Sequence, residues 1–257
     1  MSARRTAWID RLMGLAGVLG VLAGVELAVR LGLVNGAFVP RPTGVMLRTL
    51  DIVATGTLVR PLASTLSLLF AAYLGASAVA IVTGLVMGRS PAVYGLLEPT
   101  FEAVRPLPKV ALLPLLILML GLGTPMKLTV VGLTAFFPVL INTIQGARGV
   151  DPVQIDTART FGLGPVATLG KIILPAALPL ILAGMRVGLA LALIVMVTTE
   201  MVVGTGGLGF LIVDMQRSFK VLDMYAWLVV LAVVGMMLNA LFVAIERHAV
   251  HWIAHEG

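Results

Sequence analysis

The sequence predicts an all-α, polytopic membrane protein with about six transmembrane helices. Of its 257 residues, 59% are hydrophobic and 12% are charged, whereas soluble domains average about 45–50% and about 25%. Long apolar runs recur between short polar pieces, and a helix satisfies its own backbone hydrogen bonds in hydrocarbon. The alternation that barrel strands require is not sustained in any segment.

Taking roughly 20 apolar residues for each span, we expect helices near residues 12–34, 62–87, 108–122, 126–145, 172–200 and 223–245. The first run follows Arg4, Arg5 and Arg11, an order that is also typical of a secretory signal peptide. Because the run is longer than the apolar part of a signal peptide, we expect an uncleaved anchor. The expected organisation is an anchor and outer linker over 1–60, a core domain over 61–246 and a tail over 247–257.

The third expected span is interrupted by Pro106, Pro108 and Pro114. Proline lacks the backbone N–H and breaks a helix. A broken helix at membrane depth is tolerated where protein covers it or where it lines a water-filled path. These prolines therefore predict a broken gate helix beside a pathway.

The distribution of Lys and Arg predicts the orientation. With the N-terminus inside, ten of these residues fall in inner segments and six in outer ones, which favours cytoplasmic N- and C-termini. The arginines of the loop over 35–60 argue mildly for the opposite orientation. Because the basic residues are dispersed through short loops, we expect them to face lipid and expect no nucleic-acid partner.

Several motifs suggest chemistry that their context excludes. Gly204, Gly206 and Gly209 match a dinucleotide fingerprint, but they follow a spanning run, which favours a tight turn or re-entrant bend at the outer face. Gly170-Lys171 lacks the rest of a phosphate-binding loop, so the chain is not expected to bind ATP itself. The absence of Cys excludes disulfides and thiolate catalysis, and no catalytic grouping predicts an enzyme.

Histidines 248, 251 and 255 share one face of an expected C-terminal helix. A weak metal site is one interpretation, but the sequence shows no residue that would orient these imidazoles as ligands, so we expect a solvated tail, no metal and no bound cofactor.

Charged and small residues within the spans indicate contacts. Glu26 and Arg30 lie four apart and are expected to pair. Arg186, midway along the fifth span, must snorkel, pair with a neighbour or face the pathway. Near the outer end of that span, the candidate lining residues are Thr198, Thr199 and Glu200.

Glycine pairs four residues apart allow close helix approach; they are Gly20 with Gly24, Gly84 with Gly88, and Gly184 with Gly188.

One charged segment between apolar runs predicts a short, well-capped helix. Asp151 is a good N-cap, Pro152 suits the first turn, and Gly162 supplies a left-handed C-terminal residue. So short a helix is marginal alone. Ala158 and Phe161 are expected to form one apolar knob beside Asp156 and Arg159. Docking into another protein is favoured, with a helix lying on the inner leaflet as the alternative.

At this point a resemblance becomes specific. Permeases of binding-protein-dependent ATP-driven importers carry Glu-Ala-Ala, three residues, Gly, nine residues, Ile, one residue, Leu-Pro. Here Asp156-Thr157-Ala158, Gly162, Ile172 and Leu174-Pro175 stand at that spacing, with Asp for Glu and Thr for Ala. The stretches "RPLPKVALLPLLIL", "FFPVLINTIQGARGVDP", "LPAALPLILAGMRVGLALA" and "GTGGLGFLI" resemble the nitrate, sulfonate and taurine branch.

The resemblance implies the fold of a type I ABC importer permease in a bacterial inner membrane. It implies a second permease copy, two cytoplasmic ATPase subunits that use ATP and Mg, and an extracytoplasmic substrate-binding protein. Residues 151–162 would be the coupling helix, with Asp156 facing polar groups of the ATPase and Ile172 to Pro175 anchoring the fifth span. By resemblance, the chain would form half of the pathway for a small organic or inorganic anion, such as a sulfonate, taurine or nitrate, moved by alternating access. The alternatives are a permease for a different small solute, or a self-sufficient secondary transporter.

Overall fold

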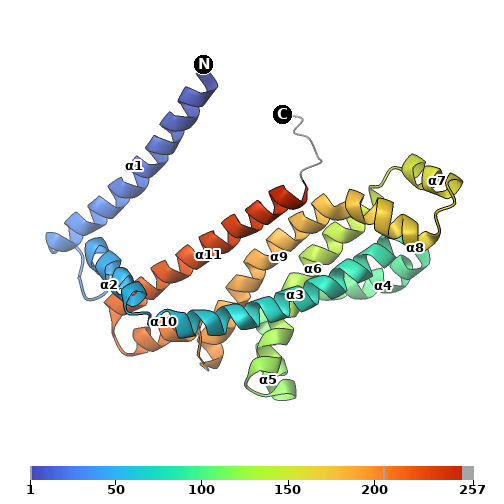
Figure 1. The fold of residues 1–257 in the computed structure, drawn as a ribbon. Helices are drawn as coiled ribbons and strands as arrows, with labels where there is room; N and C mark the ends of the chain where they lie inside the picture. Colours follow the sequence, from blue (N-terminus) through green and yellow to red (C-terminus); the bar gives the residue numbers. More distant parts are fainter. Residues whose placement is uncertain (1, 205, 251–257) are drawn as a thin grey trace. The chain divides into compact units, whose positions relative to one another are not determined.

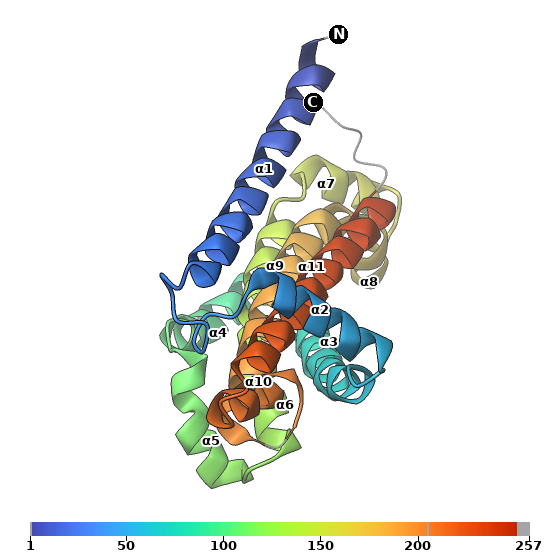
Figure 2. The same ribbon diagram turned by 90° about the vertical axis from the view of Figure 1, so that its left-hand side faces the viewer.

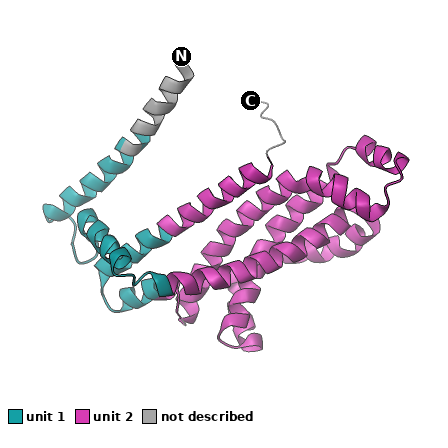
Figure 3. Cartoon of the chain, viewed as in Figure 1, with its two compact units in different colours: residues 1–60, 211–232 teal, residues 61–210, 233–257 magenta. Residues whose placement is uncertain are grey.

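The computed structural model describes residues 2–204 and 206–250, and side chains from residue 13 onward except residue 15. Every regular element in these residues is a helix. The chain forms two compact units, one of residues 1–60 and 211–232, the other of residues 61–210 and 233–257 (Figure 3). The expected tail over 247–257 and two of its histidines, 251 and 255, fall largely outside the described residues.

The first unit contains α1 (Ser2–Arg30) and α2 (Pro42–Ala54). It also takes in most of α10 (Leu208–Arg217) and the start of α11 (Val221–Ala249). The predicted pair between Glu26 and Arg30 is confirmed, with 2.8 Å between Arg30 Nε and Glu26 Oε1.

The second unit is a helix bundle. Its long helices are α3 (Val59–Arg89), α6 (Thr124–Arg148) and α9 (Leu174–Val203). Its shorter elements are α4 (Pro91–Val104), a 3-10 turn (Lys109–Leu112), α5 (Leu113–Leu120), α7 (Pro152–Thr160), α8 (Pro165–Thr168) and a π-helical turn (Leu169–Ile173). Figures 1 and 2 both show α7 beyond the ends of α6 and α9.

Glycines allow two helices, α3 and α9, to pack closely on α6. A Cβ at Gly84 of α3 would lie 2.7 Å from Thr143 Cβ, and one at Gly184 of α9 would lie 2.7 Å from Pro138 O. Gly88 and Gly188 make the next contacts along each helix. Two of the three predicted glycine pairs therefore mark close helix approach, whereas Gly20 and Gly24 have no atom within 4 Å of a built Cβ.

Four described helices are long and apolar enough to cross a membrane: 59–89, 124–148, 165–203 and 221–249. They contain the second, fourth, fifth and sixth predicted spans. The span expected over 12–34 begins among residues whose side chains are not described.

The third predicted span, 108–122, is broken as its prolines predict, but its bounds are too short. Lys109–Leu120 forms a bent pair with α4, with 83° between the two parts. Residues 91–104 form a helix that the sequence does not predict as a span, since Glu98, Pro99 and Glu102 interrupt the apolar run.

Candidate functional site

The start of α7 is capped by its own sequence. Asp151 is the N-cap, and its Oδ1 accepts a hydrogen bond of 2.9 Å from the backbone N–H of Val153. Pro152 follows in the first turn, where its missing N–H leaves no intrahelical bond unmade. Both features confirm the prediction from residues 151 and 152.

The end of α7 is a Schellman turn. Gly162 has φ +74°, its N–H donates to Arg159 O at 2.9 Å, and the N–H of Leu163 donates to Ala158 O at 3.0 Å. A Cβ at Gly162 would meet no atom within 4 Å. Glycine is therefore required at position 162 because of the positive φ, and not because a neighbouring atom leaves no room for a side chain.

The inner side of α7 packs on the bundle. Ile155 and Ala158 are buried, and Ile155 belongs to an apolar cluster with Leu85, Ala147 and Ile173. A displacement of α7 would therefore also displace the residues that it contacts, at the ends of α3 and α6 and in the helix that leads into α9.

The predicted knob of Ala158 and Phe161 is wrong as one surface. Ala158 is 4% exposed and faces the chain itself, whereas Phe161 is 79% exposed. The turn begins at Phe161, the C-cap, so the regular helical spacing between the two residues ends there.

The outer side of α7 is polar except for Phe161 and Val153. Asp156 and Arg159 pair at 3.3 Å, and each side chain is 71% exposed. So exposed a pair contributes little to folding, and both charges are accessible. Thr157 is also exposed, and its hydroxyl donates to Val153 O at 2.7 Å within the helix.

The connection from α7 to the next helix is short. From the sequence, residues 163–171 are expected to turn the chain back, but helical structure resumes at Pro165 and runs to Val203. Around Lys171 the helix is of π type, with the N–H of Leu174 donating to Leu169 O. Pro175 has no N–H with which to bond Lys171 O, which accounts for the local change of hydrogen-bond pattern.

The remaining motif residues lie on this stretch. Ile172 is partly buried and packs on the cluster that contains Ile155. Leu174 is 37% exposed, and Pro175 occupies the first turn of α9. Residues 172–175 thus connect the apolar cluster that packs against α7 to the long helix α9.

At the other end of α9, Glu200 is fully buried. Its carboxylate accepts hydrogen bonds from Thr65 Oγ at 2.9 and 3.1 Å and from the N–H of Gly209 at 3.0 Å. The ammonium of Lys127, itself 4% exposed, interacts electrostatically with it. No local sequence pattern predicts Thr65 as a partner of Glu200, because the two residues are 135 positions apart.

The other two candidate lining residues bond within α9. Thr199 is fully buried and donates to Val195 O, and Thr198 donates to Ile194 O at 2.8 Å. Neither Thr199 nor Glu200 borders open space in this structure. Between α9 and α10, Gly204, Gly206 and Gly207 have positive φ, +67°, +110° and +96°, and Gly209 lies in the first turn of α10.

The proline-rich segment forms a bend held by a lysine. Pro106 and Pro108 lie between α4 and the 3-10 turn, and Pro114 is in the first turn of α5. The ammonium of Lys109 donates to the carbonyls of Val104, Arg105 and Leu107 at 3.2, 2.6 and 2.9 Å. A cation at a helix C-terminus satisfies carbonyls that have no intrahelical partner.

A cavity of about 280 Å³ lies between α4 and α6. Its charged lining is Glu98, Glu102, Arg105 and Arg148. The guanidinium of Arg148 stacks over the Tyr94 ring at 3.7 Å, and Arg105 pairs with Glu102 at 2.7 Å. The wall therefore carries both signs of charge within a largely apolar bundle.

Arg186, for which three environments are open from the sequence, is paired. Its Nε donates to Asn239 Oδ1 at 3.3 Å, and Nη1 lies 3.8 Å from Glu246 Oε2. Both partners are on α11.

Comparison with known proteins agrees with this architecture. Residues 76–255 match the family described as "Binding-protein-dependent transport system inner membrane component". The taurine transport system permease protein TauC of Escherichia coli is 32% identical over 262 residues, covering 98% of this chain and 95% of the relative. The putative aliphatic sulfonates transport permease protein SsuC of Bacillus subtilis is 29% identical, covering 97% and 89%.

A chain of the MetNI methionine ABC transporter, solved in an inward facing conformation, superposes with a TM-score of 0.65 at 20% identity. The match covers 75% of this chain and 95% of that one, and it shows a shared fold. The extent of the family match and the likeness to TauC along the whole chain together establish that this chain belongs to the binding-protein-dependent transport system inner membrane components, the permeases of ABC importers.

Proposed function

We propose that the chain forms half of the translocation pathway of an ATP-driven importer for a small anion such as a sulfonate, taurine or nitrate, and that α7 couples it to the ATPase. The observation that carries the proposal is α7 itself. It is a self-capped helix between two long helices, with one side packed on the bundle and the other exposing Phe161 beside Asp156 and Arg159.

The exposed phenyl ring supports a protein partner. Burying an apolar side chain of this size gains about 1.5–3 kcal/mol, and Phe161 gains almost none of it within the chain. The adjacent charges are loosely held and free to pair across an interface. We place the ATPase groove on this side, with Asp156 and Thr157 facing its polar groups.

The coupling follows from how α7 is held. Ile155 and Ile172 pack on one cluster, so displacement of α7 would act on α3, α6 and the start of the 39-residue helix that ends at Val203. At about 1.5 Å per residue that helix is about 58 Å long. A tilt imposed at the α7 end would reach Glu200 at the other, which provides a route to alternating access.

The partners follow from membership of the family. A second copy of this chain would complete the pathway, two ABC ATPases would bind cytoplasmic α7 helices and use ATP and Mg²⁺, and a binding protein would deliver solute from outside. This chain would be non-catalytic, with both termini cytoplasmic in the inner membrane. The bend at Pro106, Pro108 and Pro114 and the cavity between α4 and α6 are the pathway candidates.

The substrate class rests on the relatives, which are named for taurine and aliphatic sulfonates. Arg105 and Arg148 on the cavity wall are compatible with an anion, although Glu98 and Glu102 offset their charge. A different small solute is the alternative within the same family.

Purification of the tagged chain from its host in mild detergent tests the assembly. An ABC ATPase should co-purify, and its recovery should fall when Gly162 is replaced. Proteoliposomes that contain this complex and enclosed ATP should take up labelled taurine when the binding protein is present. Uptake by the purified chain without ATP would favour a secondary transporter and contradict the proposal.

A further inference from the structure

Helix α2 carries an apolar stripe that its own unit does not cover. Met46, Leu47, Leu50 and Val53 are 54% to 69% exposed, whereas Val45 and Ile52 on the opposite side are buried. The exposed residues stand at i, i+1, i+4 and i+7, which places them on one face of the helix. This face lies outside residues 76–255, the part that matches the family.

The N-terminal end of α2 is fixed to α1. Arg41, the N-cap, makes no side-chain capping bond. Instead the Glu26 carboxylate of α1 accepts from the backbone N–H and the hydroxyl of Thr43, each at 3.1 Å. A carboxylate from another helix thus satisfies a donor in the first turn of α2, where negative charge is favourable.

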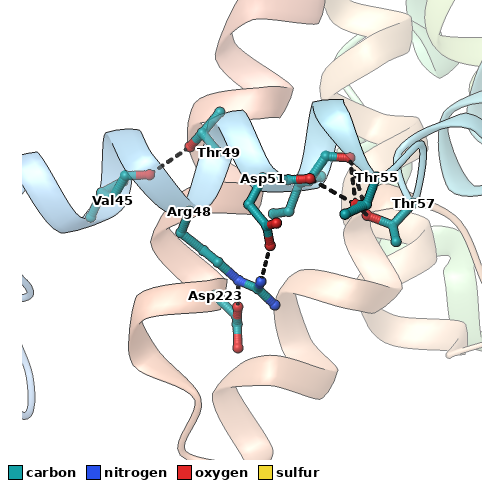
Figure 4. Close-up of polar contacts among 8 residues, drawn as sticks. Val45, Arg48, Thr49, Asp51, Thr55, Thr57 and Asp223 are labelled. Atoms are coloured by element: carbon teal, nitrogen blue, oxygen red, sulfur yellow. Dashed lines mark hydrogen bonds and ion pairs between the residues drawn. The ribbon is translucent and has the colours of Figure 1, made fainter.

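The middle of α2 is fixed to α11. Figure 4 shows the Arg48 guanidinium lying between Asp51 of α2 and Asp223 of α11, and it donates to both carboxylates. The hydrogen bond to Asp223 and its charge raise the pKa of Arg48 above its ordinary value. A Cβ at Gly44 would lie 3.5 Å from Leu222 Cδ1, so the backbone of α2 approaches the same turn.

These contacts tie α2 to the first turn of α11. Asp223 is in the first turn of α11, which is one of the helices long and apolar enough to span. The start of a spanning helix marks the boundary between hydrocarbon and headgroups. A helix held at that boundary by one side presents its other side to the outer acyl chains or to the headgroups.

We propose that α2 lies in the membrane interface, with Met46, Leu47, Leu50 and Val53 inserted into the leaflet at which α11 begins. The exposed Arg41 and Arg60, which flank the helix, would extend toward anionic headgroups. Helix α2 would then resemble an interfacial helix, which has an apolar side toward lipid and charged groups on its other sides. The polar contacts of Thr43 with Glu26 and of Arg48 with Asp223 would keep it at this depth.

The absence of cysteine from the sequence makes a direct test simple. Single cysteines replace each of the four stripe residues, a nitroxide is attached, and the full chain is reconstituted in vesicles of phosphatidylethanolamine and phosphatidylglycerol. Arg41→Cys and Lys220→Cys are matched controls at exposed cationic positions of the same unit. Collision rates with oxygen, which partitions into lipid, and with a neutral nickel chelate, which remains in water, are measured by power saturation.

The expected result is a high ratio of oxygen to nickel collisions at all four stripe positions and a low ratio at both controls. A low ratio at the stripe would place it in water and overturn the proposal. Protection from both reagents would also overturn it, because the stripe would then be covered by protein, such as a second copy. Neither readout depends on transport, so the result is independent of the proposed function.

Discussion

The Glu200 carboxylate of α9 and the Thr65 hydroxyl of α3 are hydrogen-bonded at 2.9 and 3.1 Å, and both residues are fully buried. The same hydroxyl accepts from the N–H of Leu208 at 2.9 Å, and the carboxylate accepts from Gly209. One acidic side chain therefore connects α9 with α3 and with the first turn of α10. Glu200 is thus the common acceptor of a buried hydrogen-bond network. The loss of stability on its removal depends on how many of these donors lose their acceptor.

Glu200→Ala should lower the thermal midpoint of the detergent-purified chain. It leaves the Thr65 hydroxyl and the Gly209 N–H without their acceptor, and each unsatisfied buried group costs about 1–3 kcal/mol. Glu200→Gln keeps one acceptor oxygen and should lose less. Thermal unfolding followed by a thiol-independent dye assay compares the two, with Thr198→Ala, whose bond stays within α9, as the control. Equal midpoints for Glu200→Ala and Thr198→Ala would contradict the network.

Gly207→Ala should be more damaging than Gly206→Ala. Both residues have positive φ, +96° and +110°, so each substitution incurs roughly 1–2 kcal/mol of backbone strain. A Cβ at Gly207 would also lie 2.0 Å from Glu200 Oε1, whereas one at Gly206 meets no atom within 4 Å. The difference between the two midpoints isolates the displacement of Glu200. If Gly206→Ala proved equally harmful, strain alone would account for both.

Gly162→Val should weaken recovery of the ATPase while leaving membrane insertion intact. The left-handed conformation at φ +74° disfavours a β-branched residue by roughly 1–2 kcal/mol, so the Schellman turn should open. Gly164→Val is the matched control, because Gly164 has φ −70° and equally open surroundings. The yield of co-purified ATPase relative to the permease is the measurement. Loss in both variants would point to bulk in the loop and not to the turn.

Arg48→Ala should release α2 from α11. The guanidinium bonds Asp223 across the two helices, and alanine leaves only the contact of Thr43 with Glu26 and apolar contacts. A nitroxide at Leu50 should then give a narrower spectrum, which reports faster motion. Thr55→Ala is a suitable control, since its hydroxyl bonds only nearby groups at the end of α2. An unchanged spectrum in Arg48→Ala would show that packing alone holds the helix.

The sequence predicts those parts of the site that depend on interactions between residues close together in the chain. Asp151, Pro152 and Gly162 determine the ends of α7 through bonds that span at most five residues. The orientation of the helix does not follow from these, because Ile155 is buried against Leu85 of α3. The prediction that Ala158 shares a surface with Phe161 is wrong for this reason.

The spanning helices follow from apolar length, whereas the bend before α5 depends on a cation. The prolines predict a break, and the three carbonyls bound by Lys109 fix its form. A lysine shortly after a helix-ending proline was the available signal. Thr65 offered none, because its partners at 200 and 208 are distant in sequence.

The two sides of α7 should respond differently to substitution. Ala158→Leu adds bulk to a residue that is 4% exposed, and overpacking of this kind typically costs about 1–3 kcal/mol, so the chain itself should unfold at a lower temperature. Phe161→Ala removes a ring that is 79% exposed, so the midpoint of the isolated chain should stay unchanged while ATPase recovery falls. Val166→Ala, at an 84% exposed position beyond the turn, controls for loss of surface apolar area. Thermal unfolding and ATPase co-purification are measured in parallel for the three variants. Together they distinguish effects on the stability of the chain from effects on ATPase binding. A stability loss in Phe161→Ala without a loss of ATPase would mean that the ring packs on its own chain, and the docking surface would have to lie elsewhere.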